Sequence, residues 1–156
     1  MKLTIELIPK TSWCTSVRSM LSTTEWDRLR RIAYKRADYV CEICGESGLD
    51  QGKGHPVECH EIFSYGDDFV QTLDDLICLC PRCHMVKHIG RSMAIGKSKE
   101  AISHLAKVNE FSQAEASQYI SETFTLWELR SRSQWEIDLS VLVEKYEVDQ
   151  KVIESG

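Results

Sequence analysis

The nine residues Cys80-Pro81-Arg82-Cys83-His84-Met85-Val86-Lys87-His88 carry two kinds of metal chemistry in one short stretch. The Cys80/Cys83 spacing can place two thiolates on one zinc ion, and Pro81 suits the first turn of a helix. His84 and His88 lie four residues apart, so both imidazoles would project from one face of that helix. The stretch therefore predicts a structural zinc site and, next to it, a second metal site.

A second Cys-x-x-Cys pair, Cys41 and Cys44, lies upstream. With Cys80 and Cys83 it would complete a tetrahedral four-thiolate zinc site, which leaves no coordination position for water or substrate. This zinc would therefore be structural. The segment 45–79 is longer than a simple zinc ribbon requires, so it must fold out and return the second pair to the first.

The composition favours one soluble domain. The chain has 156 residues, of which 42% are hydrophobic, and this suffices for one core over 1–156. No apolar run is long enough to cross a bilayer, and residues 1–9 alternate like a strand instead of forming a signal peptide. Seven cysteines are then expected to be reduced or metal-bound, in a cytoplasmic protein with no membrane partner.

The charge pattern indicates whether the protein is suited to bind nucleic acid. The net charge of −5 does not favour nucleic-acid binding, but the acidic excess lies in residues 101–156. Arg28, Arg31 and Lys35 belong to a basic cluster just before the first cysteine pair. This cluster is either a solvated helix face or a phosphate-contacting surface, and Lys87 is a further phosphate candidate. His55 and His104 are interpreted as surface residues.

Periodicity and capping signals predict the elements between these motifs. Helices are expected over 22–37, from 81 to near 90, over 98–108, 112–130 and 140–147. Strands are expected over 1–9, 56–64 and 135–139, the last of them pairing with the first, and residues 73–79 lead into the second cysteine pair. Residues 65–68 read as a turn.

The order of motifs resembles the HNH endonuclease family. A Cys-x-x-Cys pair is followed by a strand that ends in His60, an Asp-Leu-x-x-Leu-Cys-like segment at 74–80, and then the Cys-x-x-Cys-His-x-x-Lys-His run. The match covers 41–88. It implies an α+β fold with a ββα-metal core over 23–95, stabilised by the four-cysteine zinc site. A helical N-terminal extension and a mainly helical C-terminal extension over 96–156 would flank this core.

The resemblance also implies roles. His60 matches the general base that activates water, and Asp75 matches the asparagine that steadies the loop carrying the base. His84 matches a catalytic metal ligand on the helix, with His88 as a second ligand. Cys59 matches the ligand position that precedes the base.

Two of these positions depart from the family pattern. A cysteine at 59 is a soft ligand, better suited to zinc, nickel or iron(II) than to magnesium, and it could equally be a small buried hydrophobic residue. An aspartate at 75 lacks the amide donors of asparagine. The second ion is therefore left open among Mg²⁺, Mn²⁺, Ni²⁺ and Zn²⁺.

Two functions remain in competition. The first is a metal-dependent HNH-type endonuclease that hydrolyses nucleic-acid phosphodiester bonds, with DNA as the leading substrate. The alternative is a catalytically inactive HNH-like zinc module that binds nucleic acid or a protein partner, such as a phage or plasmid accessory or regulatory protein. Metal stoichiometry separates them, since the module would hold one ion and the nuclease two.

Overall fold

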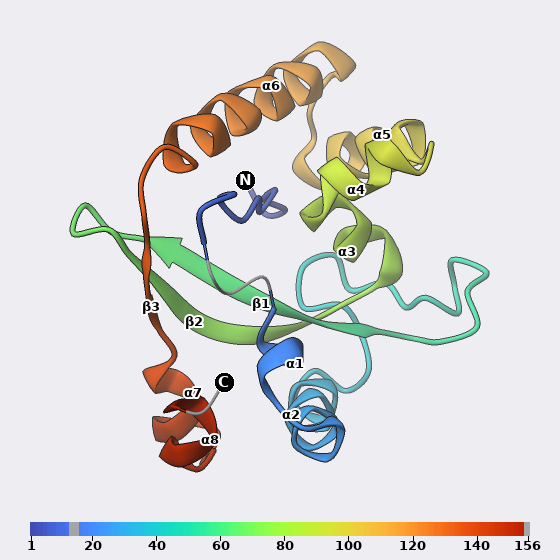
Figure 1. Cartoon of the computed structure of the whole chain (residues 1–156). Coiled ribbons are helices and arrows are strands. Elements are labelled where there is room, and N and C mark those ends of the chain that lie inside the picture. The colour runs from blue at the N-terminus through green and yellow to red at the C-terminus, as the bar shows by residue number, and fades with distance from the viewer. Residues whose placement is uncertain (13–15, 155–156) are drawn as a thin grey trace.

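The computed structural model describes residues 1–12 and 16–154, and its fold is α+β (Figure 1). The helices are α1 (Val17–Met20), α2 (Thr23–Arg36), α3 (Pro81–Lys87), α4 (Ile89–Ala94), α5 (Ser98–Asn109), α6 (Gln113–Arg130), α7 (Ser140–Glu144) and α8 (Gln150–Glu154). The strands are β1 (Glu58–Tyr65), β2 (Val70–Leu79) and β3 (Glu136–Asp138). None of the helices within the described residues has the length and apolar character that a bilayer span needs.

The sheet is built on a hairpin. β1 and β2 pair in antiparallel register, with Cys59 opposite Cys78 and His60 opposite Ile77. β3 joins the far side of β2 in parallel, so the strand order is β1-β2-β3 and one edge of β1 carries no strand among the described residues. β2 leads through Cys80 directly into α3, which gives a ββα arrangement.

The expected pairing of strand 135–139 with an N-terminal strand is wrong. Residues 1–9 form no strand, and their backbone is held mainly by side chains of later elements. Asn109 accepts hydrogen bonds from the amides of Lys2 and Leu3, both at 2.9 Å, and the Tyr119 hydroxyl accepts one from the Ile5 amide at 3.1 Å. The alternation of apolar residues in this segment reflects the burial of their side chains and not hydrogen bonding to a neighbouring strand.

The predicted helix starts are confirmed by their caps. Ser22 accepts from the Glu25 amide at the start of α2, and Ser112 forms a complete capping box with Glu115 at the start of α6. Pro81 lies in the first turn of α3, as expected, and the Cys80 side chain caps the helix. The helix that follows is interrupted at His88, whose backbone (φ −99°, ψ 48°) separates α3 from α4. The last expected helix is shorter than 140–147 and ends at Glu144.

Helices cover both faces of the sheet. The N-terminal segment and α3 to α6 lie on one side, and α1, α2, α7 and α8 lie on the other (Figure 1). Each side has its own apolar core. Leu79, Val86 and Leu105 are fully buried in the first, and Leu29 and Leu76 in the second. Because strand residues alternate between faces, consecutive residues of β1 are directed to different cores.

Candidate metal centres

The four predicted cysteine ligands come together. The sulfur atoms of Cys41, Cys44, Cys80 and Cys83 all lie within 4.8 Å of one another, and those of Cys44 and Cys80 are 3.5 Å apart. The first knuckle closes through the Gly45 amide, which donates to the Cys41 carbonyl at 2.9 Å; Gly45 has a φ of +76°, which favours glycine. Such a group of thiolates could hold a metal ion such as zinc.

His104 is buried next to this site, so its assignment to the surface is wrong. α5 packs on α3 and places His104 Nε2 3.2 Å from Cys83 Sγ, with only 5% of the residue exposed. An N–H that donates to a coordinating thiolate spreads its negative charge and fixes its orientation. His104 therefore supports the four-cysteine site from outside the ligand set.

The three histidines at 60, 84 and 88 form a second group, which we call the histidine triad. Their donor atoms lie within 4.8 Å of one another, and His84 Nε2 and His88 Nε2 are 3.2 Å apart. His60 comes from β1, His84 comes from α3, and His88 is the residue that caps the C-terminal end of α3. The ring of His60 lies 4.9 Å from that of His88, centroid to centroid.

A carboxylate holds the outer nitrogen of two triad members. Glu58 accepts a hydrogen bond from His84 Nδ1 at 2.5 Å, and this bond lowers the pKa of Glu58 to about 2. Glu6 accepts one from His60 Nε2 at 3.0 Å and also receives the Lys87 ammonium at 2.6 Å. Burial opposes ionisation of Glu6, but these two partners outweigh it and leave its pKa lowered. Metal-bound histidines characteristically donate their second N–H in this way.

The remaining nitrogens of the triad fit a cation. His60 is 3% exposed, and its Nδ1 is buried without a hydrogen-bond partner among the described residues. Burial, followed by repulsion from His84 and His60, lowers the pKa of His88 to about 3, so its ring is neutral at neutral pH. A buried unpaired nitrogen is costly unless something binds it, and a neutral imidazole nitrogen is a good ligand for a divalent metal. The triad therefore has the donor set of a three-histidine metal site.

Cys59 does not join the triad, contrary to its expected place in the ligand set. Cys59 directly precedes His60 on β1, so its side chain points to the other face, among Leu73 and Leu76. Burial raises the pKa of its thiol to about 12, which disfavours a thiolate ligand. The residue is the small buried hydrophobe of the alternative interpretation.

Asp75 is likewise directed away from His60. Its carboxylate accepts from the Tyr146 hydroxyl at 2.5 Å and from Lys145 at 2.6 Å, and it lies 3.7 Å from the Arg36 guanidinium. These partners belong to α2 and to the chain around the end of α7. Asp75 therefore joins the C-terminal region to the sheet, and its catalytic role stays a prediction.

Two of the four predicted phosphate-binding residues are engaged by other groups of the protein, and two are exposed on the predicted helix. Lys87 is 3% exposed and ion-paired with Glu6, so it is not available to phosphate. Arg28 is paired with Glu25 and also donates to the Tyr146 carbonyl at 2.7 Å. Arg31 and Lys35 are exposed on α2.

A cavity of about 180 Å³ opens at the triad, which we call the triad cavity. It runs along the unpaired edge of β1, so residues from both faces of that strand reach it. Glu61 and Arg18 line it together with the three histidines. Neither residue was among the predicted site residues. For Glu58 and Glu61 the signal was present, since one lies two residues before His60 and the other directly after it. For Arg18 and Glu6 the sequence contained no such signal, since only the tertiary fold brings these two residues close to the histidine triad.

The chain was compared with protein-family models, with curated proteins and with solved structures, and none of the three comparisons gave a match.

Proposed function

We propose that this protein is a metal-dependent endonuclease of HNH type that hydrolyses phosphodiester bonds in nucleic acid, with DNA as the leading substrate. The observation that carries the proposal is the histidine triad: each of the three histidines offers a nitrogen within 4.8 Å of the others. In addition, His60 Nδ1 is buried and has no hydrogen-bond partner among the described residues. The four-cysteine site would hold zinc and fix the start of α3, on which two of the three histidines lie.

His60, His84 and His88 would hold the working ion, with Glu6 and Glu58 orienting the first two. A divalent ion bound there would polarise the scissile phosphate and stabilise the leaving oxygen. In this arrangement His60 is a ligand, and its lone pair is not free to accept a proton. The role of general base therefore passes from His60 to another group.

Glu61 is the best placed proton acceptor. It lines the triad cavity together with His60, and the Val17 amide donates to its Oε1 at 2.9 Å, which holds the carboxylate in place. A carboxylate held in this way can take the proton from an attacking water molecule. Arg18, one residue after Val17, lines the same cavity and can neutralise charge on the scissile phosphate.

The test is cleavage of supercoiled plasmid DNA in the presence of Mg²⁺, Mn²⁺, Ni²⁺ or Zn²⁺. His84→Ala should reduce the rate by about 100-fold or more because it removes a ligand, and Glu61→Gln should do so because it removes the base. His55→Ala is the matched control, since His55 also bonds Glu58 but lies outside the triad. If the parent cleaves no nucleic acid with any of the four ions, the proposal is wrong.

A second candidate, a non-catalytic zinc module, is favoured by one observation. Asp75 is engaged by Lys145 and Tyr146 and does not support the base, as its counterpart in the family would. Metal analysis of the purified protein distinguishes the two. The module would hold one ion per chain, at the cysteines, whereas the nuclease would also bind one at the triad.

A further inference from the structure

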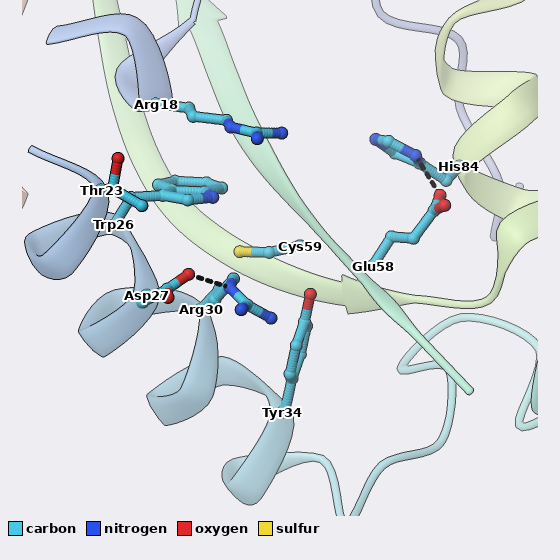
Figure 2. A pocket seen from close by; sticks show the side chains of 9 residues that line it. All are labelled: Arg18, Thr23, Trp26, Asp27, Arg30, Tyr34, Glu58, Cys59 and His84. Carbon is cyan, nitrogen blue, oxygen red and sulfur yellow. Dashed lines mark hydrogen bonds and ion pairs between the residues drawn. The ribbon is translucent and has the colours of Figure 1, made fainter. Parts of the chain in front are cut away.

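A second cavity, of about 350 Å³, lies beside the triad cavity, between α1, α2 and β1 (Figure 2). We call it the arginine cavity. Arg18, Glu58, Cys59 and His84 line it, and Arg18, Cys59 and His84 also line the triad cavity. Figure 2 shows the Arg18 side chain extending from α1 toward His84, with Arg30 and Tyr34 rising from α2. The two cavities therefore share a border at His84 and Arg18.

One face of α2 supplies the other wall of the arginine cavity. Trp26, Arg30 and Tyr34 succeed one another at intervals of four residues, so they lie on one stripe of the helix. Arg28, Arg31 and Lys35 lie outside this stripe and do not line the cavity. The sequence thus indicated a basic helix but not which of its arginines faces the site.

The cavity offers hydrogen-bond donors to an anion. Within the described residues Arg18 has no hydrogen bond or ion pair, and it is exposed at the cavity mouth. Arg30 uses its Nε to hold Asp27 at 2.7 Å, and its guanidinium also bonds to the Tyr34 hydroxyl, so Arg30 and Tyr34 face the cavity as a pair. The Tyr34 hydroxyl points into the same space (Figure 2). Planar guanidinium groups with free amino groups are well suited to phosphate oxygens.

Two carboxylates also line the cavity, and both are already engaged. Asp27 is bound by Arg30 and lies 4.0 Å from Arg31. Glu58 is bound by His84 and His55. Asp27 is balanced by Arg30, whereas the two histidines that bind Glu58 carry a positive charge only when they are protonated. Arg18 is the lining arginine with no carboxylate at ion-pair distance among the described residues. A divalent ion at the triad would add positive charge beside it.

We infer that the arginine cavity is a second phosphate subsite, in which Arg18, Arg30 and Tyr34 hold a phosphate of the nucleic-acid chain next to the scissile one. The inference rests on the proposed function, because the shared border at His84 and Arg18 is what places the two phosphates on one strand. A neighbouring phosphate held there would fix the direction in which the strand crosses the triad.

The test measures binding without cleavage. Fluorescence anisotropy of a labelled 20-base-pair DNA duplex, and of an RNA duplex of the same sequence, is recorded with no divalent ion added and at three salt concentrations. Arg18→Ala and Arg30→Ala should each weaken binding about 5- to 10-fold and reduce the slope of log Kd against log salt by about 1. Tyr34→Phe, which removes only the hydroxyl, should weaken binding about 2- to 3-fold. If the substitutions weaken binding of one duplex more than of the other, the more affected duplex shows whether the subsite holds a DNA or an RNA phosphate.

Arg31→Ala is the matched control, because Arg31 lies on the same helix and near the same Asp27 but outside the cavity. Thermal unfolding of every variant shows that the fold is kept. Equal affinities for the Arg18, Arg30 and Arg31 variants would overturn the subsite, even if the parent cleaves DNA. Selective weakening in a parent that cleaves nothing would support the subsite and overturn only the proposed hydrolysis.

Discussion

Glu6 Oε2 lies 3.0 Å from His60 Nε2, while Oε1 of the same carboxylate lies 2.6 Å from the Lys87 ammonium. This bond fixes the proton on His60 Nε2 and leaves Nδ1 as the atom with a free lone pair. The N-terminal segment, which is far from the cysteine motifs in the sequence, therefore decides which nitrogen of His60 is presented to the triad.

Glu6→Gln should weaken divalent-metal binding at the triad by about 10- to 100-fold, because an amide holds the imidazole N–H less strongly than a carboxylate does. The measurement is titration with Co²⁺, followed by its visible absorption, in protein that retains the ion at the four cysteines. Glu100→Gln is the control, since among the described residues this carboxylate is bonded only to Arg82. An unchanged Co²⁺ affinity in the Glu6 variant would show that Glu6 does not orient the ligand.

Cys44→Ser should abolish metal binding at both centres. It removes one thiolate of the four-cysteine site, and α3, which begins at that site, also carries His84 and His88. Structural zinc contributes directly to folding, so the variant should also lose helical signal in circular dichroism. Cys59→Ala should keep the metal content of the parent, because Cys59 lies outside both groups. Loss of metal in the Cys59 variant would restore this residue to the ligand set.

The Glu58–His84 pair predicts a pH dependence of stability. The folded-state pKa of Glu58, about 2, lies below its ordinary value of 4.5, so the carboxylate stabilises the fold above pH 4.5. This stabilisation is lost as the pH falls from about 4.5 to about 2. The difference in unfolding free energy between the parent and Glu58→Gln, measured by urea denaturation, should therefore shrink over that interval. A difference that stays constant from pH 6 to pH 3 would contradict the pairing.

Asp75→Asn should lower the free energy of unfolding by about 1 kcal/mol, since it removes the charge that Lys145 and Arg36 face at a partly exposed position. Metal content and Co²⁺ spectra should be unchanged, because Asp75 lies away from the triad. Tyr146→Phe should lower the free energy of unfolding less in the Asp75→Asn variant than in the parent. This non-additivity would identify the hydrogen bond that the two residues share. A change in the Co²⁺ spectrum would return Asp75 to the metal centre.

Local signals were sufficient for the parts of the fold that depend on local chemistry. The serine caps at 22 and 112 located two helices, the cysteine spacings located the four-cysteine site, and the interval from His84 to His88 placed both rings on one side of α3. Each of these depends on interactions within a few residues, and the sequence pattern records such interactions directly.

Contacts between segments that are far apart in the chain could not be predicted from the sequence pattern. The pairing of β3 with β2 instead of the N-terminal segment depends on how the chain crosses the sheet after α6, and no short pattern encodes it. The alternation along β1 could have excluded Cys59 as a partner of His60, but the match to a family position pointed the other way. Lys87 appeared free for phosphate because the sequence does not reveal that Glu6 folds over it.

The way in which the N-terminal segment is fastened sets an order of assembly during synthesis. Glu6 meets partners 54 and 81 positions further along the chain, and the amides of Lys2 and Ile5 are held by residues 107 and 114 positions away. The cysteine knuckles can close as soon as residue 83 has left the ribosome. Glu6 belongs to this N-terminal segment, which Asn109 of α5 and Tyr119 of α6 hold in place, so its carboxylate would be fixed at His60 only after both helices have emerged. The four-cysteine group could therefore form in a nascent chain well before the triad is complete.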